Sequence, residues 1–333
     1  MKTLFGAGIF SLILFACNNP IPTGPTPPPP IVIEEPPRVD QPFSWDNYHG
    51  IIAFGLGHPG QSKEDVLAFI SAVMSYGWNT FEICSETEFW EGPGYPTKPR
   101  DPERLQWLLD VISRVPGAQV ALIGNCTLKR QIPLDEQINA LRTSLPEKDI
   151  RAWHVQVADV AAHFQNIAIF THNEFDNCRS RDDWGGNRNN CAGKQDIAEH
   201  IRIYKAAGIQ YVTADDAFDP PIRGDSDTLT YTFRLANIGA FPASFHPARE
   251  KNGQPWDPSP NQLTALGRFN GDYVLSETVA FSESGNCSGL RTCNRDRIEQ
   301  YITNCAAEPH CRFTYHCENC LAGEIPTWIP QAR

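Results

Sequence analysis

Short apolar runs separated by longer amphipathic segments dominate the chain from about residue 48 onward. Each run has the length of a buried strand and is followed by polar or turn-forming residues. The predicted strands span residues 50–57, 79–84, 120–124, 167–170, 211–214, 241–245, 273–276 and 312–315. The sequence therefore predicts eight strands with polar segments at their carboxyl ends.

The segments between these runs show helical periodicity with recognisable start and stop signals. Ser62 is a predicted N-cap, Asp101-Pro102 is a strong helix start, and Gly208 ends a helix at 192–207. Further helices are expected at 134–143, 149–164 and 233–238 and after Asn294. Strands alternating with helices indicate an α/β fold with a parallel sheet, and eight strands are the number that closes a (β/α)8 TIM barrel. An open doubly wound sheet is the alternative, but no G-x-G-x-x-G follows the first strand.

The first 43 residues have a different composition. Lys2, an apolar stretch at 4–15 and Leu14-Phe15-Ala16-Cys17 resemble a bacterial lipoprotein signal, with Cys17 as the lipidated residue. An ordinary signal peptide cut near Ala16 is the alternative. Residues 18–43 are rich in proline and predict an extended linker. We therefore expect a signal at 1–17, a linker at 18–43 and a catalytic domain at 44–333, exported and anchored to a bacterial membrane facing the periplasm or cell exterior.

Composition and charge indicate the size of the domain and which classes of molecule it is expected to bind. The 333 residues are 41% hydrophobic and 20% charged, which suits one large domain. A formal net charge of -11 argues against nucleic acid, because a surface that follows phosphates is basic. We expect a monomer that needs no cofactor.

The 11 cysteines support export, since removing Cys17 leaves an even number. Spacing predicts disulfides that clip loops, and the expected pairs are Cys84–Cys126, Cys178–Cys191, Cys287–Cys293, Cys305–Cys311 and Cys317–Cys320. The rival interpretation is a zinc site at Cys317-Glu-Asn-Cys320, but no matching second pair is evident. The sequence therefore predicts no metal site.

Two glutamates follow the predicted fourth and seventh strands, in T-H-N-E-F-D-N (Glu174) and Y-V-L-S-E-T (Glu277). The carboxyl ends of barrel strands carry the chemistry of this fold. Cleavage of a glycosidic bond with retention needs one carboxylic acid and one carboxylate about 5–5.5 Å apart. Asn173-Glu174 and Glu277 resemble the clan A retaining glycoside hydrolases over about residues 48–328. The resemblance implies that Glu174 is the acid/base, Glu277 is the nucleophile, and Asn173 binds the sugar 2-hydroxyl.

Several other residues are candidates for binding the substrate. His172 adjoins the Asn-Glu pair, and His246 follows the sixth strand, where clan A enzymes often place a His or Tyr. Trp184 and Trp256 lie in polar loops where their rings could stack on sugars. Tyr315 stands where the family usually has a tryptophan, although Trp328 could fold back to that place. The arginine that the family often carries early in the barrel is not evident.

Other arrangements of carboxylates stay open. Glu82 and Glu86 near the second strand could form a different acid pair with Glu174, and the default for both is a solvated surface position. Asp215 and Asp216 end the fifth strand, where they could contact a substrate hydroxyl or cap the next helix.

Other reaction classes fit less well. A serine hydrolase is disfavoured because no G-x-S-x-G elbow occurs, and His154, His163 and His172 do not fall on successive strand ends as metal ligands would. The sequence thus predicts a glycosidase acting on a carbohydrate. The alternative is an inactive, lipid-anchored glycan-binding barrel.

Overall fold

The structure is a computed structural model in which a compact unit begins at Pro37. It describes residues 37–38, 41–85, 100–124, 147–171, 194–216, 242–245, 263–264, 267, 271–275, 280–281, 291–292, 295–317, 320, 323–326 and 328–333.

The main sheet is a ring of parallel strands. Its order is β5-β4-β3-β2-β1-β11-β8-β7-β6, and every neighbouring pair is parallel. These strands are β1 (His49–Ile52), β2 (Thr80–Cys84), β3 (Gln119–Ile123), β4 (Ile167–Phe170), β5 (Val212–Thr213), β6 (Asp215–Asp216), β7 (Ala243–Phe245), β8 (Tyr273–Leu275) and β11 (Cys311–Tyr315).

The two ends of this sheet are joined through one short segment of chain. Only Ala214 separates β5, which pairs with β4, from β6, which pairs with β7. Counted as one strand, β5 and β6 reduce the nine strands to eight and close the sheet into a barrel. All eight predicted strands are therefore confirmed, as is the α/β barrel. A separate two-stranded sheet of β9 (Ala280–Phe281) and β10 (Arg291–Thr292) was not predicted.

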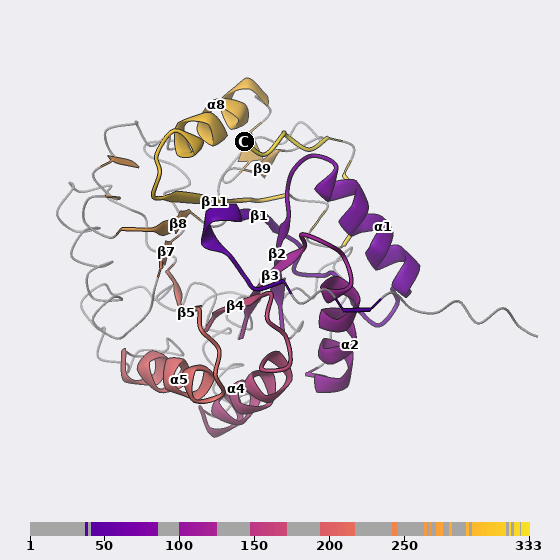
Figure 1. The fold of residues 1–333 in the computed structure, drawn as a ribbon, viewed down its shortest axis with the longest axis vertical. Coiled ribbons are helices and arrows are strands. Elements are labelled where there is room, and N and C mark those ends of the chain that lie inside the picture. The colour runs from indigo at the N-terminus through magenta and orange to yellow at the C-terminus, as the bar shows by residue number, and fades with distance from the viewer. Residues whose placement is uncertain are drawn as a thin grey trace, which may run out of the picture. The chain divides into compact units, whose positions relative to one another are not determined.

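Five helices surround the ring in the described part of the chain (Figure 1). They are α1 (Lys63–Met74), α2 (Pro102–Ser113), α4 (Glu147–Ala161), α5 (Lys194–Ala206) and α8 (Arg295–Ala306). Ser62 forms a capping box with Asp65 at the start of α1, and Asp101 accepts a hydrogen bond from the Arg104 backbone at the start of α2. The predicted helices at 134–143 and 233–238 lie outside the described residues. Among those described, no helix has the length and apolar character needed to cross a membrane.

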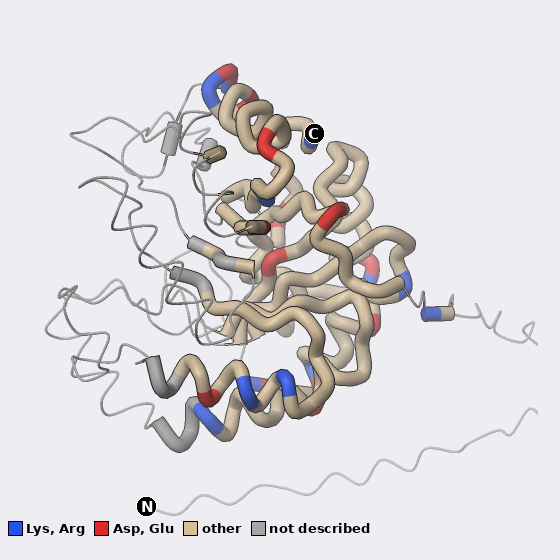
Figure 2. Tube along the Cα trace, turned by 60° about the vertical axis from the view of Figure 1, so that its left-hand side comes forward, with Lys and Arg blue, Asp and Glu red and all other residues tan. Residues whose placement is uncertain are grey.

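Alternation along the strands divides the buried residues into two groups. Outward residues such as Phe81, Val120 and Ile169 pack against the helices, whereas inward residues such as Ile52 and Phe170 belong to a second cluster within the barrel. Both sets are almost fully buried, which explains why the strands appear in the sequence as nearly continuous apolar runs. The helices are amphipathic, and Figure 2 shows charged positions of both signs along α4 and α5.

The segment just before β1 helps to fill the barrel. Several inward positions on the strands are small, among them Gly50, Ala121 and Ala168. The space is taken by Phe43, Trp45 and Tyr48, which are at most 6% exposed. Trp45 lies in the short helix η1 (Trp45–Asn47). We call these three aromatic residues the aromatic plug; their segment lies across the ring of strands in Figure 1.

Residues ahead of the aromatic plug also contact the barrel. Arg38 donates to Asp110 of α2 at 2.7 Å, and the Gln41 side chain accepts a bond from the Gly117 backbone at 3.0 Å. Burial raises the pKa of Asp110, but hydrogen bonds from Arg114 and Arg38 outweigh this effect and hold the pKa below its usual value. Arg38 and Gln41, near the end of the predicted linker, therefore contact the barrel.

Candidate active site

The carboxyl ends of β2, β3 and β4 form a well-ordered edge. Backbone hydrogen bonds continue beyond the strands, from Ser85 N to Ile123 O at 2.9 Å, from Gly124 N to Phe170 O at 2.8 Å and from Thr171 N to Thr213 O at 2.8 Å. The chain is therefore held by its neighbours up to the residue at which each loop begins. The loops that follow β2, β3 and β4 therefore begin at residues whose backbone positions are fixed by hydrogen bonds to the neighbouring strand.

The segments that carry the predicted catalytic glutamates start from this end of the barrel. Glu174 follows β4, and Glu277 follows β8, two strands that run parallel in the same closed sheet. The loop residues predicted to act in catalysis or binding lie outside the described residues; they are His172, Asn173, Glu174, Trp184, His246, Trp256 and Glu277. The structure describes the strands that lead to these residues.

A buried polar cluster supports the edge at β3 from outside the barrel. Ser85 Oγ donates to Gly124 O at 2.8 Å, and the Trp153 indole of α4 donates to Ser85 Oγ at 3.1 Å. Next to it, His154 Nδ1 and the Tyr204 hydroxyl of α5 share a hydrogen bond of 2.7 Å. A Cβ at Gly124 would clash with that hydroxyl and with the His154 ring, so a larger residue here would displace both side chains.

His154 also stacks on His200, with ring centroids 3.9 Å apart, and both side chains are at most 1% exposed. His154 therefore contributes to the packing of α4 against α5. No group of three or more His, Cys, Asp or Glu that could hold a metal ion occurs within the described residues.

Glu82 lies in the middle of β2 on the inward face of the barrel. Its neighbours across the sheet are Ile52 of β1 and Ala121 of β3, and the residue is 0% exposed. The expected surface position is therefore wrong, because the alternation along β2 directs Phe81 and Ile83 outward and Glu82 inward. Glu86 lies outside the described residues. Asp215 and Asp216 form β6, and Asp215 lies beside Ser244 of β7.

Tyr315 has a different role from the one predicted. It is 1% exposed and stacks on Trp78, with ring centroids 5.7 Å apart, in the cluster between strands and helices. Thr314 before it faces the barrel interior and shares a hydrogen bond with Tyr48, so alternation turns Tyr315 outward. Tyr315 therefore packs the outer core in place of the expected contact with substrate. Trp328 packs edge-on against it at 6.5 Å.

Two predicted disulfides are confirmed, Cys305–Cys311 and Cys317–Cys320. The second one replaces the rival zinc interpretation of that cysteine pair. Cys84 is disulfide-bonded, and Cys126, Cys178, Cys191, Cys287 and Cys293 lie outside the described residues.

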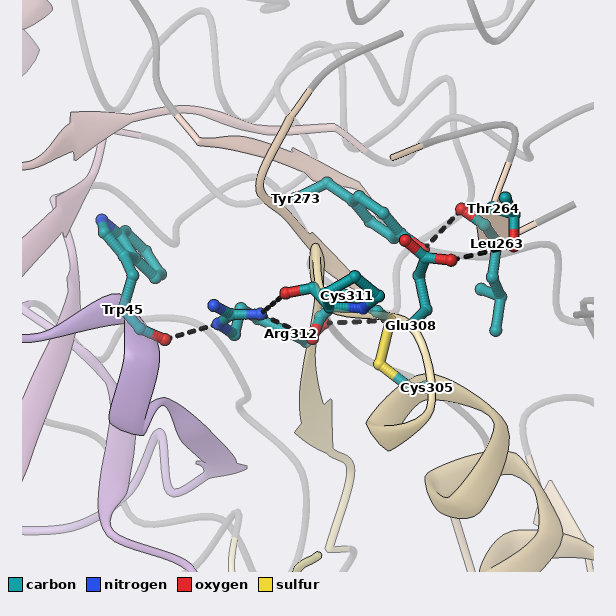
Figure 3. The surroundings of a disulfide bond; sticks show 9 residues. Trp45, Leu263, Thr264, Tyr273, Cys305, Glu308, Cys311 and Arg312 are labelled. Carbon is teal, nitrogen blue, oxygen red and sulfur yellow. Dashed lines mark hydrogen bonds between the residues drawn. A yellow bond between two sulfur atoms is a disulfide. The ribbon is translucent and has the colours of Figure 1, made fainter. Parts of the chain in front are cut away.

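The Cys305–Cys311 bond ties the end of α8 to the start of β11 (Figure 3). In the turn between them, Glu308 accepts a hydrogen bond from Thr264 at 2.9 Å. Burial and, to a smaller degree, the Glu308 charge raise the pKa of the nearby Tyr273 phenol far above its usual value. Tyr273 therefore stays a neutral donor, and its hydroxyl bonds Leu263 O at 3.0 Å.

Comparison with solved structures shows barrels of the same kind. A glycoside hydrolase family 5 protein from Bacteroides vulgatus matches with a TM-score of 0.57 at 10% identity, covering 85% of this chain and 60% of that one. An endo-beta-1,4-mannanase from Thermotoga petrophila matches with a TM-score of 0.52 at 11% identity, covering 81% and 67%. XacCel5A in complex with cellopentaose matches with a TM-score of 0.51 at 12% identity, covering 81% and 88%.

These likenesses confirm, at the level of the fold, the resemblance to clan A seen in the sequence. No protein-family model matches the chain, and no curated protein matches it.

Proposed function

We propose that this protein is a retaining glycoside hydrolase that cleaves O-glycosidic bonds of a polysaccharide or oligosaccharide. The observation that carries the proposal is the closed parallel barrel, in which the strands preceding Glu174 and Glu277 end on the same side. Loops that leave one end of a barrel can bring their side chains together above its centre. The fold of the mannanase and of the cellopentaose complex supports a β-1,4-linked glucan or mannan as the first substrates to test.

In the proposed reaction, Glu174 protonates the departing glycosidic oxygen while the Glu277 carboxylate attacks the anomeric carbon. The bond to the leaving sugar breaks as a covalent glycosyl-enzyme bond forms. Glu174, now ionised, takes a proton from water, and the resulting hydroxide attacks the anomeric carbon and releases Glu277. Two inversions give net retention. Asn173 would hold the 2-hydroxyl, a contact that strengthens in the transition state.

The remaining expectations extend this proposal. The signal-like segment at 1–17 and the proline-rich linker support an exported protein held to a bacterial membrane by a lipid on Cys17. Such a protein would work on glycans outside the cytoplasm as a monomer. His172, His246, Trp184 and Trp256 would line the substrate cleft.

The test compares the full-length protein with Glu174→Ala and Glu277→Gln on β-linked glucans, mannans, xylans and galactans. We expect each substitution to lower kcat/KM by about 10²–10⁴-fold or more, because general acid/base catalysis typically raises a reaction rate by about that factor. Glu64→Gln, an exposed glutamate of α1, is the matched control and should leave the rate unchanged.

The stereochemistry and the nucleophile can be tested separately. Proton NMR of the first product should show the anomeric configuration of the substrate. A Glu277→Gln protein that still hydrolyses at the wild-type rate would refute the nucleophile assignment. Glycan binding without hydrolysis by the wild type would instead favour the inactive, glycan-binding barrel.

A further inference from the structure

A cavity lies at the end of the barrel where the strands begin, opposite the end from which the segments with the predicted catalytic residues leave. Its volume is about 220 Å³, and its walls come from η1, the start of β1, the end of α8, the start of β11 and the carboxyl terminus. His49 is the first residue of β1 and Cys311 the first of β11, so the cavity opens where the strands begin. Part of this region is shown in Figure 3, where Arg312 lies between Trp45 and the Cys305–Cys311 bond.

The charges around the cavity balance one another. Asp46 and Glu308 carry negative charge, and Arg312 and Arg333 carry positive charge. Each is engaged by the protein: Arg312 lies 3.5 Å from Asp46, Glu308 accepts from Thr264, and Arg333 donates to Thr303 at 2.8 Å. Because the lining holds two charged side chains of each sign, their charges sum to zero and favour neither an anion nor a cation.

Arg312 in particular is not placed to clamp an anion. Its Nε donates to Trp45 O, and its Nη1 donates to Pro309 O at 2.7 Å and to Cys311 O at 3.1 Å. A guanidinium binds a carboxylate or phosphate through a pair of open donors, and most of these donors are already engaged. Its role is to join the aromatic plug to the turn before β11.

His49 is a polar side chain of this cavity whose ring nitrogens are open to a ligand. Its backbone N–H is held by Asn79 Oδ1 at 3.2 Å, whereas neither ring nitrogen makes a hydrogen bond within the described residues. Burial and the nearby Arg312 charge lower the pKa of His49 below 6.5, so the ring is neutral at physiological pH. A neutral imidazole offers one donor and one acceptor, which matches a hydroxyl group.

The remaining walls and the size set the shape of a ligand. Exposed Ala306 supplies apolar surface, and small accessible parts of Trp78, Phe313 and Ile302, which are at most 7% exposed, complete the apolar lining. Pockets for drug-sized ligands measure about 300–1,000 Å³, so a cavity of about 220 Å³ suits a smaller molecule. A ligand that is neutral, compact, apolar on its ring faces and hydroxylated at its edge fits this combination.

We propose that this cavity binds a single neutral sugar unit, either a free monosaccharide or the end of a glycan chain, with His49 hydrogen-bonded to ring hydroxyls. The proposal does not rest on the proposed hydrolysis, because it uses residues at the opposite end of the barrel. This cavity would then be a second carbohydrate-binding site, separate from the proposed site of cleavage.

The test measures binding of glucose, mannose, galactose and xylose to the full-length protein by saturation-transfer NMR and by titration calorimetry. We expect one of the four to bind in the millimolar range. His49→Ala removes one or two hydrogen bonds and should weaken binding about 10-fold. Ala306→Trp fills the cavity from its exposed lip and should abolish binding at this cavity.

Two controls distinguish binding at this cavity from other kinds of binding: the Glu277→Gln variant for the proposed active site, and inorganic phosphate for an anion site. Sugar binding at the cavity should be unchanged in Glu277→Gln, whereas binding at the proposed active site should change. The same sugar affinity in Glu277→Gln with and without Ala306→Trp, or the absence of any sugar binding up to about 50 mM, would overturn the proposal. Binding of inorganic phosphate that His49→Ala weakens would do the same, since it would identify an anion site.

The variants need a check on folding and on protonation. The midpoints of thermal unfolding of Ala306→Trp and His49→Ala should stay close to that of the wild type. If His49→Ala does not fold, the binding data for Ala306→Trp alone test whether the cavity binds sugar. Because His49 titrates below its ordinary range, the sugar dissociation constant should be flat between pH 8 and pH 6.5 and rise at lower pH.

Discussion

The two ends of the barrel differ in the residues and contacts that form them. At the end where the strands begin, the aromatic plug fills the interior, and Trp45 lies within 6.4 Å of the rings of Phe43, Tyr48, Phe170 and Tyr211. At the end where the strands finish, the backbone is held to Ser85, Gly124 and Thr171, and the sequence beyond turns polar. The first arrangement stabilises the fold, and the second offers loops for chemistry.

This difference follows from where each end obtains its residues. The end that holds the plug draws together chain segments far apart in the sequence, as when Arg312 bonds the Trp45 carbonyl and Tyr48 bonds Thr314. The opposite end draws on residues that directly follow the strands. Substitutions at the plug end should therefore change the free energy of unfolding, whereas substitutions in the loops should change the rate of the proposed hydrolysis.

The largest expected effect on stability comes from Trp45→Ala. Trp45 is 6% exposed and occupies space that small strand residues leave open, so its removal creates a cavity. We expect the free energy of unfolding to fall by about 3–5 kcal/mol, measured by urea unfolding, with kcat for the proposed hydrolysis retained in the folded protein. Tyr76→Ala is the control, because Tyr76 is 37% exposed and its loss should cost far less. Equal losses in the two variants would contradict the proposed role of the plug.

Removing the Cys305–Cys311 bond should have the next largest effect. The bond closes a loop with a sequence separation of 6 next to the cavity at the plug end. The chain-entropy relation gives about 2 kcal/mol for a loop of this length. The double variant Cys305→Ser, Cys311→Ser should therefore lower the urea midpoint while leaving the slope with urea nearly unchanged. A stability equal to wild type would show that the turn is held by Glu308 and Arg312 alone.

The sequence predicted the barrel well because its signals are local. Buried parallel strands leave continuous apolar runs, and Ser62 and Asp101 mark helix starts through contacts only a few residues away. Disulfides between cysteines close in sequence, such as Cys305 and Cys311, follow from spacing for the same reason.

The positions that the sequence predicted poorly depend on distant partners or on strand register. Trp45 fills the barrel because inward residues on other strands are small, which no local pattern records. Tyr315 and Glu82 were placed by their nearness to strand ends, although alternation along β11 and β2 decides their direction. Glu174 and Glu277 rest on the same kind of reasoning about strand ends and stay predictions.

A smaller effect is expected from the Tyr48–Thr314 hydrogen bond. The two hydroxyl oxygens lie 2.7 Å apart in a buried position between the aromatic plug and β11. Tyr48→Phe and Thr314→Val should each lower the free energy of unfolding by about 1 kcal/mol, and the double variant should lose less than the sum. A strictly additive double variant in urea unfolding would show that the bond does not couple the plug to the barrel.

The smallest expected effect concerns pH and His49. Burial, followed by the Arg312 charge, lowers the pKa of His49 in the folded protein below the ordinary value of 6.5. Well above pH 6.5 the ring is neutral in both the folded and unfolded states and contributes no pH dependence. As the pH falls through 6.5, the unfolded chain binds a proton at this ring more readily than the folded protein does, so the free energy of unfolding decreases.

The variant His49→Gln cannot bind this proton. Urea unfolding at pH 7.5 and pH 5.5 should therefore show a larger loss of stability on acidification for the wild type than for His49→Gln. An equal loss in both proteins would mean that His49 is not held neutral at this end of the barrel.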